Sequence, residues 1–239
     1  MAQKDIEYNG ITFSISYTIQ NPKAKKSILF LHGWGSNKEI MQQAFGNYLT
    51  NYRHIYVDMP GFGSTPNSVV LTTSDYAGII KNFLELVGGA DIVVGHSFGG
   101  KVATLLNPNT LVLLSSAGIL VPKPFSIRTK IALFKLLKPF GGAKIRKMFI
   151  SSDAKDMDQN MYETFKNVVD EDFEDNFCNV KSKALLFWGK DDTATPLWSG
   201  KKIASLIPEA TLYPMSGDHF FFLKNAKDIS QIISKSLGE

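Results

Sequence analysis

The chain has a single cysteine and no hydrophobic run long enough to span a bilayer. Because Cys178 is the only cysteine among 239 residues, an internal disulfide is impossible. No Cys and His residues occur at metal-ligand spacing, and we expect no metal or other cofactor. The apolar stretch 111–121 contains two serines and is too short for a membrane span, and no signal-peptide pattern opens the sequence. We therefore expect a soluble, cytoplasmic protein.

Charge is distributed unevenly along a chain of ordinary composition. The net charge is +4, and 44% of residues are hydrophobic, which is enough for the core of one α/β domain. Segment 121–150 holds eight basic residues and no acid, whereas segment 151–176 holds nine acids against Lys155 and Lys166. Adjacent blocks of opposite sign indicate either internal pairing or a surface that meets a charged partner.

Short apolar segments alternate with helical patterns along most of the chain. Residues 5–19 alternate around Asn9-Gly10, which predicts a β-hairpin. Strands are predicted at 27–31, 54–57, 91–94, 110–114, 183–188 and 211–213, and helices at 37–50, 73–87, 196–206 and 224–236. This alternation predicts an α/β fold with a mostly parallel central sheet flanked by helices. The long gap between the strands ending near 116 and starting near 183 predicts a helical insertion.

The most informative motif is Gly-His-Ser-Phe-Gly at 95–99, because it directly follows a buried-strand pattern and precedes a helical one. A sharp turn from strand to helix exposes the serine and leaves room only for glycine on either side. The same turn places the backbone N–H of Phe98 at the start of a helix. There it can donate to a substrate oxygen that gains negative charge, which the helix dipole also favours. The motif predicts that Ser97 is a nucleophile, with an ordinary glycine-rich turn as the alternative.

Other chemically useful groups follow the predicted strands, whose carboxyl ends meet at one edge of the sheet. The sequence His-Gly-Trp-Gly at 32–35 predicts that the backbone N–H of Trp34 is a second oxyanion donor. Two acids, Asp191 and Asp192, follow the strand at 183–188, and His219 follows the strand at 211–213. The chain order Ser, Asp, His is the one expected when a nucleophile elbow of this kind belongs to a catalytic triad.

The sequence has four candidates for the base. His54 lies inside a predicted strand, and strand alternation directs His96 away from the nucleophile, so both are interpreted as packing residues. We expect His32 to hydrogen-bond backbone groups in its own loop. The remaining candidate, His219, is predicted to be the base.

The choice of acid is less clear-cut. Asp192 fits the position that orients the imidazole better than Asp191, which stays an alternative. Asp218 adjoins His219 too closely to orient its ring and is expected to stabilise a turn.

Together these motifs, with Asp-Met-Pro-Gly-Phe-Gly-Ser at 58–64, resemble the α/β-hydrolase superfamily over essentially the whole chain. The resemblance implies acyl transfer to Ser97 through His219, held by Asp192, with the N–H groups of Trp34 and Phe98 as the oxyanion hole. It implies a core of 1–117 and 181–239 with a helical lid at 118–180. Two departures are a short connection after the nucleophile turn and Gly-Asp-His in place of the commoner Gly-His.

The resemblance to pimeloyl-carrier methyl ester esterases suggests a carboxylic ester or thioester as substrate. Trp34, Phe98 and Phe220 are predicted to bind the acyl group. In the insertion, an apolar helical face is predicted at Ile127, Ile131, Phe134 and Leu137, opposite the basic Arg128, Lys135 and Lys138. This basic face is either simply the solvated face of a lid helix, or a surface that docks an acidic acyl carrier protein or contacts an anionic membrane. No nucleic-acid partner is expected.

Two other functions stay open at the level of sequence. C–C bond hydrolases of the meta-cleavage type, which act on 2-hydroxy-6-oxo-dienoates, use the same triad, but they usually have Asn where this chain has His96. A hydrolase fold retained as a non-catalytic binding module usually lacks a triad member, and none is missing here. Ester hydrolysis is therefore the preferred prediction.

Overall fold

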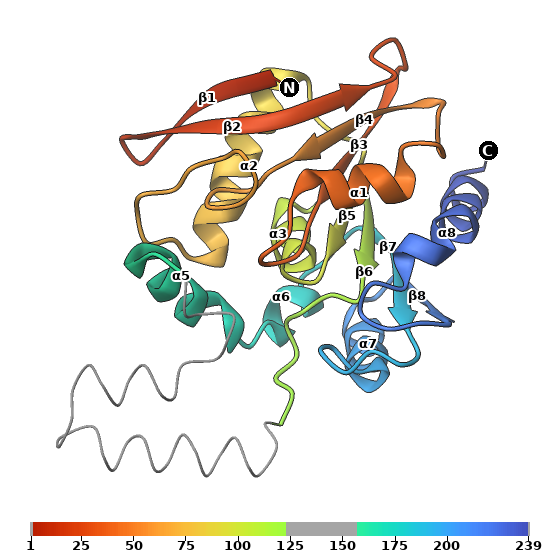
Figure 1. The fold of residues 1–239 in the computed structure, drawn as a ribbon. Helices are drawn as coiled ribbons and strands as arrows, with labels where there is room; N and C mark the ends of the chain where they lie inside the picture. The colour runs from red at the N-terminus through yellow and green to blue at the C-terminus, as the bar shows by residue number, and fades with distance from the viewer. Residues whose placement is uncertain (1, 123–156, 239) are drawn as a thin grey trace, which may run out of the picture.

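The computed structural model describes residues 2–122 and 157–238 and contains an eight-stranded sheet in the order β1-β2-β4-β3-β5-β6-β7-β8 (Figure 1). The predicted helix with the basic face, at 127–138, lies outside the described residues. The strands are β1 (Ala2–Tyr8), β2 (Ile11–Gln20), β3 (Lys26–Leu31), β4 (Tyr52–Val57), β5 (Ile92–His96), β6 (Thr110–Leu114), β7 (Lys183–Gly189) and β8 (Ala210–Met215).

The sheet combines an N-terminal hairpin with a parallel core. Strands β1 and β2 pair antiparallel with Tyr8 opposite Ile11, and both Asn9 and Gly10 have positive φ, as a two-residue type I′ turn requires. Strand β2 pairs antiparallel with β4, and the pairs from β4 through β3 to β8 are all parallel. The predicted hairpin and the predicted α/β fold class are confirmed.

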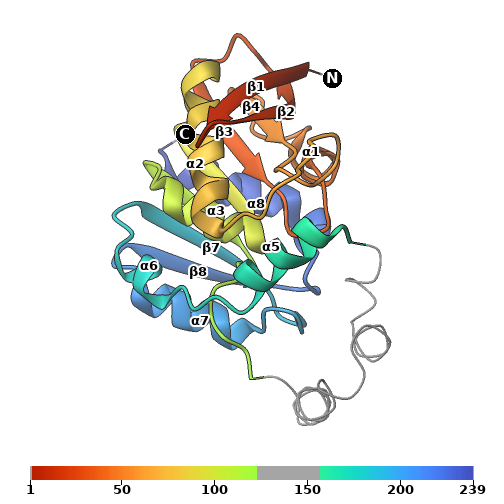
Figure 2. The ribbon, with the colours of Figure 1, turned by 90° about the vertical axis from the view of Figure 1, so that its left-hand side faces the viewer.

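Helices cover both faces of the sheet (Figures 1 and 2). One face packs against α1 (Lys38–Phe45) and α8 (Phe222–Ser236), and the other against α2 (Thr73–Val87), α3 (Phe98–Leu106) and α7 (Leu197–Leu206). Of the parallel strands between these layers, β3, β5, β6 and β7 are almost wholly apolar and buried, as strands covered on both faces require. Among the described residues, no helix is long and apolar enough to cross a membrane.

Two element boundaries differ from those expected from sequence. Helix α1 ends at Phe45, well before residue 50, and is capped by Gly46. The chain then turns at Leu49, which has a φ of +52°, and β4 starts at Tyr52. Strand β8 continues through Pro214 to Met215. Proline is tolerated there because β8 is an edge strand whose outer N–H groups need no partner.

The described part of the insertion between β6 and β7 is helical, as predicted. It contains α5 (Gln159–Val169) and α6 (Glu174–Cys178), which lie at the end of the sheet toward which β5 and β6 run (Figure 1). Side chains of α5 bond to the loop before α2: Thr164 Oγ1 accepts from Leu71 N at 3.0 Å, and Asn160 Nδ2 donates to Asn67 O at 2.8 Å. Helix α5 is therefore hydrogen-bonded to the core.

Candidate active site

Ser97 occupies a strained turn between β5 and α3. Its φ of +51° and ψ of −115° are rare for a residue with a side chain. A Cβ on Gly95 would lie 2.3 Å from Gly99 O, and one on Gly99 would lie 2.5 Å from His32 O. The two flanking glycines are therefore required by backbone contacts on both sides of the turn, which is the geometry that the motif predicts.

The loop after β3 lies directly against this turn. A Cβ on Gly33 would be 3.2 Å from Ser97 Cβ and 2.9 Å from His96 Nδ1. Among the described residues, the backbone N–H groups of Trp34 and Phe98 have no acceptor, and Phe98 is the first residue of α3, whose N–H has no partner within the helix. Two free N–H donors on adjoining loops flank Ser97, as an oxyanion hole needs.

Buried polar contacts hold the loop that carries Trp34. His32 Nδ1 donates to Gly33 O at 2.7 Å and its Nε2 accepts from Met59 N at 3.1 Å, so the predicted backbone-bonding role of His32 is confirmed. Lys38 Nζ forms an ion pair with Asp58 Oδ2 at 2.6 Å, and both side chains are almost fully buried. These contacts anchor both ends of the loop to the turn after β4, so the Trp34 N–H is fixed in place.

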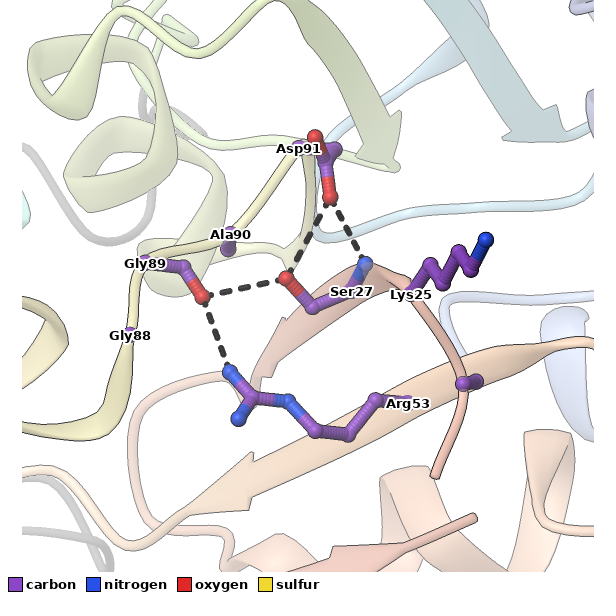
Figure 3. Close-up of a pocket in the computed structure, with 8 residues that line it drawn as sticks. Lys25, Ser27, Arg53, Gly88, Gly89, Ala90 and Asp91 are labelled. Carbon is purple, nitrogen blue, oxygen red and sulfur yellow. Dashed lines mark hydrogen bonds between the residues drawn. The ribbon is translucent and has the colours of Figure 1, made fainter. Parts of the chain in front are cut away.

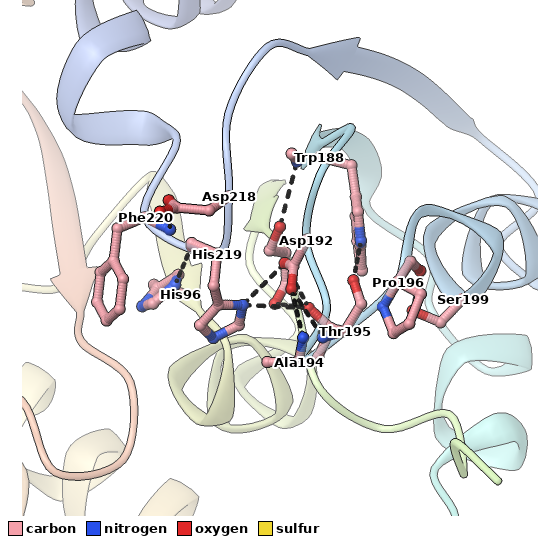
Figure 4. Close-up of polar contacts among 12 residues, drawn as sticks. His96, Trp188, Asp192, Ala194, Thr195, Pro196, Ser199, Asp218, His219 and Phe220 are labelled. Carbon is pink, nitrogen blue, oxygen red and sulfur yellow. Dashed lines mark hydrogen bonds and ion pairs between the residues drawn. The ribbon is translucent and has the colours of Figure 1, made fainter. Parts of the chain in front are cut away.

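His219 and Asp192 form a hydrogen-bonded pair at the ends of β8 and β7 (Figure 4). His219 Nδ1 donates to Asp192 Oδ2 at 2.8 Å, and the Asp192 side chain is fully buried. The alternative acid, Asp191, is exposed. Asp218 Oδ1 accepts from Phe220 N at 2.9 Å, so Asp218 stabilises the turn as predicted. Of the three carboxylates, Asp192 is the one bonded to the His219 imidazole.

Asp192 is held by further donors that were not predicted from sequence. Its Oδ1 accepts from the N–H groups of Ala194 and Thr195, each at 2.9 Å, and Thr195 Oγ1 lies 2.9 Å from Oδ2. Burial alone would raise the pKa of Asp192, but the hydrogen bonds from His219 and Thr195 outweigh it and lower the pKa. The carboxylate is therefore ionised and fixed, so it can orient an imidazole.

His96 forms a contact with the His219 loop that sequence reasoning also missed. Its Nε2 donates to His219 O at 3.0 Å and its ring lies 4.7 Å from the His219 ring, on the other side of His219 from Asp192 in Figure 4. His96 Nδ1 is buried without a partner, so the donating hydrogen is on Nε2. Strand alternation directs the ring away from Ser97, as expected, but toward the loop that carries His219. His96 therefore ties β5 to that loop.

We expect the free energy of unfolding to fall steeply below about pH 6.5. Burial lowers the pKa of His96 to about 3 and that of His32 to about 4, and burial lowers the pKa of His54 as well. Unfolded histidines titrate near pH 6.5, so between these values the unfolded state binds more protons and stability rises with pH. The contribution of His96 and His32 is up to about 2.7 kcal/mol per pH unit, measurable by urea unfolding from pH 7.5 to 4.5.

A His96→Asn variant is the matched control for this pH dependence. It keeps a side-chain donor but cannot titrate, so the slope between pH 6 and pH 4.5 should fall by up to about 1.4 kcal/mol per pH unit. Asp58 and Asp192 contribute little in this range, because hydrogen bonds keep the pKa of both below the ordinary value. An unchanged slope in the variant would contradict a neutral, buried His96.

Ser97 adjoins a cavity of about 110 Å³ formed by elements on both sides of the turn. Trp34 and Phe98, both predicted to bind substrate, line it, whereas Phe220 is exposed and lies with its ring 5.6 Å from that of His219. Among the described residues Ser97 Oγ forms no hydrogen bond with His219. Such contacts often tighten only when substrate is bound. The cavity also has walls that were not predicted: Lys101, Ala117, Phe165, Val168 and Val169.

A larger hollow, of about 400 Å³, lies at the amino ends of the parallel strands, beside Ser27 and Asp91. Figure 3 shows the residues that line it. Several of its polar groups are already paired: Asp91 Oδ2 accepts from Ser27 N at 2.7 Å, and Arg53 donates to Val87 O and Gly89 O at the end of α2. The amino ends of parallel strands carry stabilising contacts, whereas chemistry is found at their carboxyl ends. The smaller cavity beside Ser97 is therefore the candidate active site.

Comparison with known proteins agrees with this geometry. Residues 28–231 match the model of the alpha/beta hydrolase family. The pimeloyl-[acyl-carrier protein] methyl ester esterase of Proteus mirabilis is 32% identical over 92 residues, which is 37% of this chain and 34% of that protein. The bifunctional biotin biosynthesis protein BioHC of Teredinibacter turnerae is 32% identical over 91 residues, 36% of this chain and 15% of that protein.

The matched segments thus span about a third or less of these two curated relatives. Among solved structures, an esterase from Exiguobacterium antarcticum aligns with a TM-score of 0.77 over 100% of both chains, at 18% identity. That identity indicates a shared fold.

Proposed function

Because the chain belongs to the alpha/beta hydrolase family and is a hydrolase, we propose that it cleaves a carboxylic ester or thioester through an acyl-enzyme on Ser97. The observation that carries the proposal is the 2.8 Å hydrogen bond between buried Asp192 and His219. A fixed carboxylate on Nδ1 leaves Nε2 of the imidazole free to accept a proton, which is what a serine nucleophile requires.

The reaction then proceeds in two steps, acylation of Ser97 and hydrolysis of the acyl-enzyme. His219 Nε2 takes the Ser97 Oγ proton as Oγ attacks the acyl carbon, and the N–H groups of Trp34 and Phe98 stabilise the oxyanion. The imidazolium returns its proton to the leaving alcohol or thiol as the acyl bond to that group breaks. Water, deprotonated by His219, then attacks the acyl-enzyme, and the imidazolium returns that proton to Ser97 Oγ as the acyl–Oγ bond breaks and the acid is released.

A fluorophosphonate probe tests this proposal directly. Native protein should gain the mass of one phosphonyl group, because an activated serine is phosphonylated, and Ser97→Ala should gain none. Intact-mass spectrometry measures both. Absence of labelling on native protein would favour the binding-module interpretation, and labelling that persists in Ser97→Ala would place the nucleophile elsewhere.

The names of the relatives suggest the class of substrate. The Proteus relative is named for an ester on an acyl carrier protein, and we propose that segment 118–180 of this chain is a lid that can meet such a carrier in the cytoplasm. The basic residues invoked, Lys135 and Lys138, lie outside the described residues. A panel of free and carrier-bound esters, with a 2-hydroxy-6-oxo-dienoate for the C–C alternative, distinguishes these substrates.

A further inference from the structure

The cavity beside Ser97 is small. Its volume of about 110 Å³ is below the roughly 150 Å³ of an engineered cavity that holds one benzene molecule. Trp34 and Phe98 form one part of its wall, and Phe165 and Val168 from α5 form another. If Ser97 carries the acyl group, the part of that group inside this cavity has only a few carbon atoms.

One of the residues that line the cavity is a buried lysine. Lys101 lies four residues after Ser97 on α3, and its side chain is 1% exposed. Its Nζ donates to Val168 O and to Glu171 Oε2, each at 2.6 Å. An ammonium has three donors, and within the described ranges the third has no acceptor. A residue that lines this largely apolar cavity therefore carries an ammonium with one donor for which the described residues supply no acceptor.

The charge of this ammonium is already balanced. Glu171 pairs with Lys101, and it also accepts a hydrogen bond from Thr73 Oγ1 at 2.5 Å. The rings of Phe98 and Phe173 lie 5.9 and 5.3 Å from Lys101 Nζ, so little water reaches the ammonium, whereas Glu171 is partly exposed. A second carboxylate here would leave an uncompensated buried charge, which is costly. A neutral oxygen would accept the third hydrogen bond without that cost.

We propose that Lys101 determines specificity, so that the part of the acyl group inside this cavity carries a neutral oxygen acceptor such as a keto, hydroxyl or ether oxygen. This inference rests on the proposed function, because it places the acyl group on Ser97. The simpler alternative is that Lys101 only ties α3 to the segment after α5. The two differ in one respect: a tether affects all substrates alike, whereas a specificity-determining donor affects only those with an acceptor.

The test compares two esters of equal chain length, p-nitrophenyl 4-oxopentanoate and p-nitrophenyl pentanoate, on native enzyme and on Lys101→Met. The kcat/KM of the 4-oxopentanoate ester divided by that of the pentanoate ester should fall about tenfold in the variant, equivalent to about 1.4 kcal/mol. The different chemical reactivity of the two esters cancels, because it is the same for both enzymes. An equal ratio in the two enzymes would overturn the proposal.

A second measurement on native enzyme alone covers the case in which Lys101→Met does not fold. The 3-oxo, 4-oxo and 5-oxo esters are compared with their alkyl counterparts, each kcat/KM divided by the rate of hydroxide hydrolysis. Preference for one oxo position supports the proposal, and no preference overturns it. Fluorophosphonate labelling and alkyl-ester turnover persist if this inference alone is wrong, and both are lost if the proposed function is wrong.

Discussion

Replacing Ser97 with alanine is expected to lower kcat for an ester substrate by about 10⁶, and His219→Ala should have a similar effect. The nucleophile Ser97 and the base His219 act only together. Without the base the Ser97 hydroxyl is not deprotonated, and without Ser97 the base has no nucleophile to activate. The double variant should therefore be no slower than either single variant. Steady-state assays with p-nitrophenyl esters measure all three.

The non-additive pattern is the decisive part of this experiment, because Ser97 and His219 share no hydrogen bond among the described residues. Circular dichroism and thermal unfolding of each variant serve as the folding control. Losses that multiply in the double variant would mean that the two residues act independently. A His219→Ala variant that keeps more than about a hundredth of native activity would require another base.

The hairpin and the nucleophile turn could be predicted because their causes are local. Asn and Gly are the residues that most readily adopt the positive φ of this turn, and the clash of a Cβ at Gly95 arises from the backbone of Gly99 within the same turn. The parallel core could be predicted because strands covered on both faces must be continuously apolar. Apart from the need for glycine at 99, which is set by Leu31 O and His32 O, these features need no knowledge of distant parts of the chain.

The contacts that sequence reasoning missed join segments far apart in the chain. His96 bonds to the carbonyl of a residue 123 positions later, and Lys101 reaches Glu171, 70 positions later. Neither partner leaves a periodic signal. The Thr195 contact with Asp192 is local, and an acid followed three residues later by threonine could have been recognised as a side-chain turn.

The substitution Asp192→Asn should leave the fold intact and lower kcat by about 10⁴. An asparagine keeps the shape of the side chain, and its oxygen can still accept from the N–H groups of Ala194 and Thr195. Its amide then presents hydrogens to His219 Nδ1, which favours the tautomer protonated on Nε2. That tautomer cannot accept the Ser97 proton, and no carboxylate stabilises the imidazolium.

Asp191→Asn is the matched control, because it makes the same chemical change one residue away on an exposed side chain. It should stay within about twofold of native activity, since solvent screens the charge at that position. Urea unfolding separates catalytic from structural losses in both variants. A large loss in Asp191→Asn with little change in Asp192→Asn would transfer the role of the acid to Asp191, and the buried 2.8 Å pair with His219 would then be structural.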